Sequence, residues 1–415
     1  MAHTRFEIGG EFVRSWRAML AVILGMWVSA IPSYSIGAFI GPVSAEFGAS
    51  LTQVTGWSLA WSFGCVLSAP VVGAIADRVG ARRVILTALA SLTAALLAVS
   101  SLTKDLTGFY VGALALGAIG AGTSAITYGR VVNSRFDLGL GTALGLMSVG
   151  LGLGAVFGPR LMQAIIDSFG WRQAFAALAL LPLAVLPLLV AWLREGSSAT
   201  GRELVSSDGA TRGEAMRRSV FWVLAAGTIL YGVCVGGVSV NLIPFLTSDG
   251  LSRADAASAA GLFGAATVVG RLFGGMIIDR ARVHVAILLA IVLVAEAAAF
   301  VMLGLGGGTY LIPALLVFGV SVGAEADGLA YCTIKIFGRR CFGSIYAVLG
   351  IVMLYIGTGI GPVLFNATRD WLGSYQLAFY VWAGLALMAA PLFASVVRVP
   401  FFDQPNAPLA AAGAG

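Results

Sequence analysis

The sequence contains twelve apolar segments, each about 20 residues or longer, and only short polar segments separate most of them. A run of about 20 apolar residues is long enough for one helix to cross the hydrocarbon core of a bilayer. Only 11% of the residues are charged, whereas about a quarter are charged in soluble domains. We therefore predict an all-α membrane protein with twelve transmembrane helices. The predicted spans are 18–40, 56–76, 84–102, 108–133, 139–161, 172–193, 219–243, 256–278, 284–304, 308–334, 343–366 and 375–397.

The distribution of positive charge predicts the orientation of these spans. Eighteen of the 25 Lys and Arg residues fall on the side of the termini, and five fall in the opposite loops. Because short cytoplasmic loops are enriched in Lys and Arg, both termini are expected in the cytoplasm, here of a bacterium with the chain in its inner membrane. The predicted domains are an N-terminal six-helix bundle (1–193), a cytoplasmic linker (194–218), a C-terminal six-helix bundle (219–400) and a cytoplasmic tail (401–415).

The two halves of the chain are related in sequence. Residues 73–78 (GAIADR) recur as 275–280 (GMIIDR), and residues 154–159 (GAVFGP) recur as 357–362 (GTGIGP), at an offset of 202 to 203 residues. Matches at one offset indicate a duplicated six-helix unit. In transporters built from such repeats the substrate binds between the halves near the bilayer midplane, and access alternates from side to side.

Residues 73–83 (GAIADRVGARR) resemble the loop between helices 2 and 3 of the major facilitator superfamily, and the repeat adds a second copy between helices 8 and 9. The resemblance implies the major facilitator fold of two pseudo-symmetric six-helix bundles. We expect these charges to pair with helix ends and neighbouring charges and so to hold the outward-open form; anchoring by the positive-inside rule is the alternative. The predicted conformational switch consists of Gly73, Asp77, Arg78, Arg82, Arg83, Asp279 and Arg280.

Gly145, Gly154 and Gly158, followed by Pro159, resemble the first part of the antiporter signature of the same superfamily. Arg160 follows where the signature would continue, so the match is incomplete. Close helix packing and a helix end bent by proline are the interpretation we favour.

Arg271 lies inside a predicted span, in the segment TVVGRLFGG. An arginine in hydrocarbon costs about 2.5–3.5 kcal/mol on insertion scales, so such residues face the protein interior or an aqueous cavity. Snorkelling toward the nearby interface is the alternative. The segment resembles helix 8 of monocarboxylate porters and oxalate:formate antiporters, and this resemblance implies that Arg271 binds a substrate carboxylate. A guanidinium is suited to this task because it bonds a carboxylate with two parallel hydrogen bonds.

Two departures from that resemblance narrow the prediction. Residues 350–359 (GIVMLYIGTG) on helix 11 contain no Lys or Arg where the oxalate exchanger has a second cation, and this favours a monoanion over a dianion. Thr267 stands where monocarboxylate porters have an Asp, so proton coupling through that pair is in doubt. Glu325 and Asp327 on helix 10 are our proton-coupling candidates, because buried carboxylates bind protons more readily. Asp327 is the better candidate for the cavity, because it lies four residues before Tyr331 and shares its helix face, whereas Glu325 points elsewhere. Pairing with an arginine, or binding of a substrate ammonium, are alternatives for both acids.

Polar residues on helices 1, 4, 7, 10 and 11 complete the predicted site. As a group they could hydrogen-bond a carboxylate or shape an apolar pocket, although any one of them alone is more typical of packing. Glu296 on helix 9 is interpreted as structural, and Arg130 as snorkelling or pairing. The residues predicted to bind substrate are Arg271, Tyr34, Tyr128, Tyr331, Asn241 and Tyr355, with Tyr231 in the same group of helices.

These features favour a secondary transporter for a small organic monoanion, monocarboxylate-like and taken up with a proton. An efflux antiporter for drug-like or cationic compounds is the alternative, and an anion exchanger or a transport-like sensor is the weaker one. We see no Ser/His, Cys/His or metal-ligand constellation and no nucleotide loop, so we predict no enzyme, cofactor or metal. The basic residues sit in loop clusters, which disfavours nucleic acid. The expected partners are the organic anion, protons and the lipid bilayer, with the chain as a monomer.

Overall fold

A computed structural model describes residues 2–136, 140–194, 209–280, 284–306, 308–338 and 340–399. The description of side chains leaves out residues 2–9, 140–141, 275–280, 326–327 and 351 within those ranges. Twelve helices in the described residues are long and apolar enough to cross a membrane. The prediction of an all-α membrane protein with twelve spans is therefore confirmed. The predicted domain boundaries stay a prediction.

The first half of the chain contains the helices α1 (Ala2–Phe47), α2 (Leu51–Val79), α3 (Ala81–Leu102), α4 (Leu106–Gly120), α5 (Ala125–Asn133), α6 (Leu140–Phe169) and α7 (Trp171–Trp192). The second half contains α8 (Arg212–Arg217), α9 (Ser219–Ser248), α10 (Arg253–Arg280), α11 (Val285–Leu305), α12 (Gly308–Phe337), α13 (Phe342–Tyr346), α14 (Leu354–Leu372) and α15 (Tyr375–Ser395). Short helical turns are η1 (Ala121–Thr123), η2 (Ala347–Met353) and η3 (Val396–Arg398).

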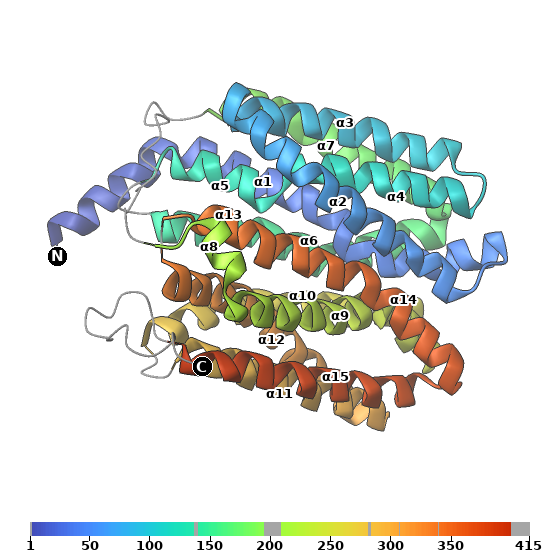
Figure 1. Cartoon of the computed structure of the whole chain (residues 1–415). Helices are drawn as coiled ribbons and strands as arrows, with labels where there is room; N and C mark the ends of the chain where they lie inside the picture. Colours follow the sequence, from blue (N-terminus) through green and yellow to red (C-terminus); the bar gives the residue numbers. More distant parts are fainter. Residues whose placement is uncertain are drawn as a thin grey trace.

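The two halves form two neighbouring groups of helices that run roughly parallel to one common direction (Figure 1). The start of α1 and the turn η3 lie at the same end of the molecule, as an even number of spans requires. We call this end the terminal end and the opposite end, where α1 leads into α2, the distal end. Helix α8 lies at the terminal end, inside the predicted linker.

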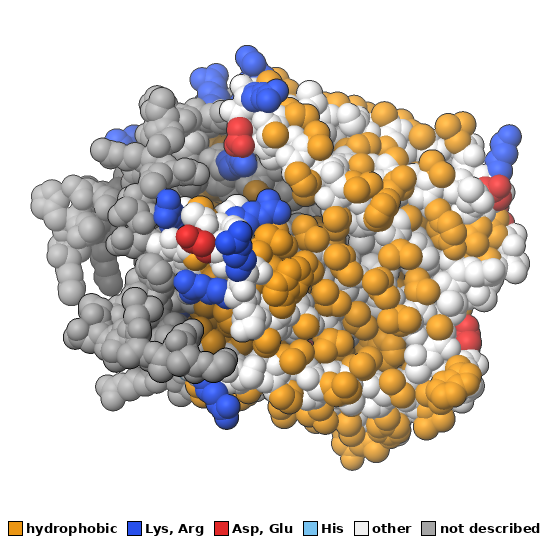
Figure 2. All heavy atoms as spheres, viewed as in Figure 1, with side chains coloured by type: hydrophobic (Ala, Val, Ile, Leu, Met, Phe, Trp, Pro, Cys, Tyr) orange, Lys and Arg blue, Asp and Glu red, His pale blue; other side chains and the backbone are white. Residues whose placement is uncertain are grey.

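The surface is apolar around the middle of the molecule and charged at its ends (Figure 2). Large apolar side chains are exposed there, such as Leu67 and Phe157, each with 58% of its surface accessible. Exposed apolar area of this extent on a monomer marks contact with another apolar phase, and twelve apolar helices identify that phase as lipid. The blue Lys and Arg side chains gather mainly at the terminal end (Figure 2).

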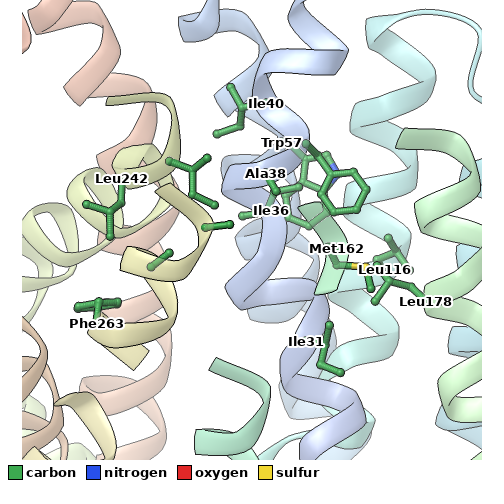
Figure 3. Packing of buried hydrophobic residues seen from close by; sticks show 14 of the residues in the cluster. Ile31, Ile36, Ala38, Ile40, Trp57, Leu116, Met162, Leu178, Leu242 and Phe263 are labelled. Atoms are coloured by element: carbon green, nitrogen blue, oxygen red, sulfur yellow. The ribbon is translucent and has the colours of Figure 1, made fainter. Parts of the chain in front are cut away.

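Apolar side chains fill each bundle, and glycines bring particular helices close together. In the first half Leu116, Met162 and Leu178 of α4, α6 and α7 lie against one another and are almost completely buried (Figure 3). A Cβ atom on Gly154 of α6 would lie 2.6 Å from the Ala30 side chain of α1, and Gly158 is similarly tight. Gly145 has open space around it, so close packing holds for two of the three glycines singled out in the sequence.

Three spans differ from the predicted ones. The fourth span is broken at η1, where a Cβ on Gly122 would lie 2.6 Å from Ala88 of α3, so close helix packing accompanies the break. The eleventh span contains the π-helical turn η2, a feature that often marks functional sites. Helix α6 continues through Pro159 to Phe169, whereas the predicted span ended at residue 161.

Candidate substrate site between the two halves

The described polar contacts between the halves lie from the middle of the interface to the distal end. The Thr52 hydroxyl of α2 donates to Asp370 Oδ2 of α14 at 2.6 Å. One turn further along α2, Asn366 Nδ2 donates to the Thr55 hydroxyl at 3.3 Å. On the other side of the molecule Arg253 Nη1 of α10 lies 3.7 Å from Asp167 Oδ1 of α6. The distal end is therefore closed by polar contacts between the halves.

Three tyrosines from α1, α9 and α14 meet near the middle of the interface. A side-chain hydrogen bond joins Tyr355 of α14 to Cys65 of α2. Tyr34 of α1 is in electrostatic contact with both Tyr355 and Tyr231. The Tyr231 hydroxyl donates to the Val322 carbonyl oxygen of α12 at 3.4 Å. The site therefore includes groups from both halves of the chain.

Charged groups of the second half surround Tyr231 from two sides. Tyr231 is in electrostatic contact with Glu325 of α12 and with Arg271 of α10. Glu325 is 3% exposed and Arg271 is partly buried. A cation and an acid so placed can bind an anion and a proton in one small volume, because each binds a ligand of charge opposite to its own.

The position of Arg271 is set by a close crossing of α10 and α12. A Cβ on Gly323 of α12 would lie 2.1 Å from the Thr267 carbonyl oxygen and 2.6 Å from the Arg271 backbone nitrogen. Gly270 and Gly319 make similar approaches along the same pair of helices. The absence of side chains at these positions lets the two backbones touch and fixes the backbone of Arg271 against α12.

The Arg271 side chain has a buried Nε with no hydrogen-bond partner among the described residues. Buried polar atoms are rarely left in this state, and a functional role is one of the standard reasons. A guanidinium that is partly buried, and not fully bonded to its own protein, can receive a carboxylate. Thr267, one turn before it, donates its hydroxyl to the Phe263 carbonyl oxygen at 3.0 Å within its own helix.

The remaining predicted site residues lie in different surroundings. Tyr128 of α5 is 0% exposed and packs inside the first bundle, where its hydroxyl would lie 2.2 Å from a Cβ on Gly25. In this conformation it has no accessible surface for a ligand. Asn241 of α9 is also 0% exposed; it donates to the Gly237 carbonyl oxygen at 2.8 Å and accepts from Asn366 at 2.6 Å. Asn241 thus belongs to the network that closes the distal end.

Two predicted residues on α12 are only partly described. The Lys335 ammonium lies 5.7 Å from the ring centroid of Tyr331, toward the terminal end. The side chain of Asp327 lies outside the described residues, so its pairing and its exposure stay predictions. Of the two acids predicted on this helix, Glu325 is the one with described contacts to the site.

The predicted switch loop of the first half makes contacts within that half. Arg130 of α5 donates to Asp77 Oδ1 at 2.5 Å and to the Gly73 carbonyl oxygen at 3.5 Å. Arg82 donates to the carbonyl oxygens of Leu193 and Val190 at the end of α7, at 2.5 and 2.7 Å. Exposed Arg78 and Arg83 lie at the same end. The side chains of Asp279 and Arg280 lie outside the described residues, and the switch role stays a prediction.

Two residues of the site, Asn366 and Glu296, were not assigned to it from the sequence. Asn366 sits in an ordinary polar helix end, and its bond to Asn241 joins two helices that are far apart in sequence. Glu296 was interpreted as structural, yet it is 0% exposed and in electrostatic contact with Glu325. Its signal was present, since a carboxylate within an apolar span indicates function by default. Among the described residues no cluster of three His, Cys, Asp or Glu side chains could hold a metal ion.

Two groups of membrane-spanning helices that meet around polar groups near the middle of their interface are typical of transporters with alternating access. Residues 22–362 match the Major Facilitator Superfamily, so the chain belongs to that family of transporters, which are not enzymes. Its resemblance to the superfamily, expected from the loop motif, is confirmed.

Relatives of described function are found at low identity. The chain is 26% identical to monocarboxylate transporter 11 of Homo sapiens over 381 residues, which cover 88% of this chain and 79% of the relative. It is 26% identical to a gallate transporter of Pseudomonas putida over 428 residues, covering 85% of this chain and 91% of the relative.

Solved structures share the fold. A bacterial homologue of the human lysosomal transporter Spinster, in an inward-facing and unoccupied conformation, matches with a TM-score of 0.75 at 16% identity, covering 92% of this chain and 96% of that one. The human organic anion transporter MFSD10 matches with a TM-score of 0.65 at 18% identity, covering 91% and 99% of the two chains.

Proposed function

We propose that this protein transports a small organic monoanion, a monocarboxylate, together with a proton. The observation that carries the proposal is Arg271, a partly buried guanidinium inside a span with a buried Nε that has no hydrogen-bond partner among the described residues. Such a group would bond a carboxylate through two parallel hydrogen bonds, and it stays charged at any physiological pH. Relatives that transport monocarboxylate and gallate, as their names state, support this substrate class.

The surroundings of Arg271 support a monoanion whose remaining part is aromatic or forms hydrogen bonds. Tyr34, Tyr231 and Tyr355 would close around the part of the substrate that lies away from the carboxylate. Tyrosine rings offer apolar faces and a hydroxyl at one edge, so they suit aromatic acids as well as hydroxy acids. One guanidinium balances one carboxylate, and the described residues around Tyr231 add no second cation.

Transport would proceed by rocking of the two halves about this site. With both termini in the cytoplasm, the distal end faces outward, and its contacts Thr52–Asp370 and Asn366–Thr55 would be the ones that break when the site opens outward. The Asp77–Arg130 pair would change partners at the terminal end during the same step. Glu325, and Asp327 beside it, would take up the coupled proton in this bacterial inner-membrane protein.

Uptake into proteoliposomes tests the proposal. Purified full-length protein would be assayed with radiolabelled lactate and benzoate, with and without an inward proton gradient. We expect uptake that rises with the gradient, and uptake at background level for Arg271→Ala. Anion uptake that survives Arg271→Ala would overturn the binding site. Uptake that does not depend on the gradient would show that anion transport is not coupled to protons.

A further inference from the structure

A second buried acid lies behind the proposed anion site, inside the second bundle. Glu296 of α11 is 0% exposed, and both its carboxyl oxygens have no hydrogen-bond partner among the described residues. It is in electrostatic contact with Glu325 of α12 and with Tyr231 and Cys234 of α9. A fully buried carboxyl group without hydrogen bonds is much costlier when ionised than when protonated.

Among the described residues no positive group is in electrostatic contact with Glu296. Its charged neighbour there is Glu325, which has the same sign, and α9 contributes a tyrosine and a cysteine. Helix α15, which also packs on α11, has no ionisable residue between Tyr380 and Arg398. Asp327, whose side chain is not described, would add a further negative charge.

Two neighbouring carboxyl groups in such surroundings cannot both be ionised, because each disfavours the charge of the other. Glu296 is the deeper of the two, whereas Glu325 shares the neighbour Tyr231 with the cation Arg271. The negative charge of the pair therefore belongs on Glu325, and the proton on Glu296.

We propose that Glu296 and Glu325 form a two-carboxyl proton site, in which Glu296 keeps a proton and Glu325 gains one when an anion binds Arg271. The second step rests on the proposed function. A bound carboxylate neutralises Arg271, so an ionised Glu325 loses the positive charge that balanced it. Glu325 then takes a proton from water on the open side of the site, and one proton enters with each anion.

Infrared spectroscopy of the reconstituted full-length protein tests the proton on Glu296 without any substrate. At neutral pH we expect a carbonyl stretch of a protonated carboxyl group in apolar surroundings. This band should be absent in Glu296→Gln and present in Glu325→Gln. Asp249→Asn, which changes an exposed carboxyl group at the end of α9, is the matched control and should keep the band. A band that persists in Glu296→Gln would overturn the assignment.

Adding benzoate tests the second proton. In the wild type the protonated-carboxyl band should grow, and the increase should be missing in Glu325→Gln and in Arg271→Ala. No increase in a wild type that transports benzoate would overturn the coupling step. If the wild type transports none of the tested anions, the proposed function fails, while the substrate-free spectra still decide whether Glu296 carries a proton.

The pH dependence of uptake distinguishes two roles of Glu296. In a tuning role it changes the proton affinity of Glu325, and in a packing role it only fills space in the bundle. Glu296→Leu removes the polar neighbour of ionised Glu325, so the pH of half-maximal uptake should rise by about one unit, tenfold in proton concentration. Glu296→Gln keeps a polar neighbour of the same shape and should keep the wild-type midpoint. A Glu296→Leu variant with lower uptake but an unchanged midpoint would contradict the tuning role.

Discussion

The two bundles derive from one repeated unit, yet their charged groups differ. In the first bundle Arg130 is paired with Asp77 at 2.5 Å, and the two side chains are 38% and 69% exposed. In the second bundle Arg271 has a buried Nε, and Glu296 two carboxyl oxygens, with no hydrogen-bond partner among the described residues. The buried polar atoms without a partner that the described part of the first bundle contains belong to neutral side chains, those of Ser35, Trp57 and Tyr128. The ionisable groups of the second bundle therefore keep a donor and acceptors that a ligand or a proton could occupy.

This difference indicates that the halves have separate tasks in one rocking mechanism. The first half would supply a rigid wall with Tyr34 and Cys65, and the second half would supply the charges. Because buried unpaired groups are costly, a bundle retains them where a ligand or a proton completes them.

The largest effect is expected from the two arginines. Arg271→Ala should weaken benzoate binding by about 100-fold, because a bidentate charge-assisted contact is worth about 3 kcal/mol. Arg130→Ala should leave the affinity within about threefold, since its partner is Asp77 and not substrate. Isothermal titration calorimetry in detergent measures both. Equal losses in the two variants would show that the charges of the halves are not divided in this way.

The glycine contacts provide a matched pair for the second test. Gly323→Ala places a Cβ 2.1 Å from the Thr267 carbonyl oxygen, and Gly117→Ala in the first bundle places one 2.0 Å from the Trp61 carbonyl oxygen. Both should lower the free energy of unfolding by about 1–3 kcal/mol, because the helices must separate. Only Gly323→Ala should also weaken anion binding, since only α12 positions Arg271.

Thermal unfolding and titration with benzoate would be measured on the same samples. Gly129→Ala, where the added Cβ meets nothing within 4 Å, is the control that should change neither quantity. A Gly117→Ala variant that weakens binding as much as Gly323→Ala would contradict the separate tasks.

The fold was predictable from the sequence because its main determinant is local. The length of an apolar run decides whether a helix can span the bilayer, and that length needs no tertiary information. Helix α6 exceeds its predicted span because residues 162–169 carry polar side chains such as Gln163 and Asp167, which the apolar window excluded. The breaks at η1 and η2 were not predictable, since they accompany contacts with other helices.

Residues of the site were predictable only where the side chain itself has a high free-energy cost in hydrocarbon. Arg271, Glu325 and Asp327 stood out because charge in hydrocarbon requires a reason. Tyr128 was predicted to bind substrate because it is a polar residue on helix 4, but the rotation of each helix about its own axis depends on packing, and α5 turns Tyr128 inward. Tyr231 became central through its contacts with groups on four other helices, which no spacing in the sequence reveals.

The third prediction concerns the contacts that join the halves at the distal end. Asn366→Ala removes a donor to both Asn241 and Thr55 and leaves the Asn241 oxygen buried. The conformation closed at the distal end should lose about 1 kcal/mol relative to its alternative, a shift of about fivefold in population. Distances between spin labels on α2 and α14 would report the shift. Thr228→Ala, which removes a bond within one helix, should leave the distances unchanged.

The smallest effect is expected at the Asp77–Arg130 pair, and its pattern separates a switch from an anchor. The two side chains are 69% and 38% exposed, so water screens their attraction and Asp77→Asn should change the free energy of unfolding by less than about 1 kcal/mol. If the pair changes partners during transport, the same substitution should lower the uptake rate of benzoate by about threefold at unchanged affinity.

If the loop only anchors the chain, Asp77→Asn should leave the uptake rate unchanged. Arg78, Arg82 and Arg83 would still keep the positive charge at the terminal end. Initial rates in proteoliposomes, together with affinity by titration, distinguish the two. A rate equal to that of the wild type would reduce this loop to an anchor.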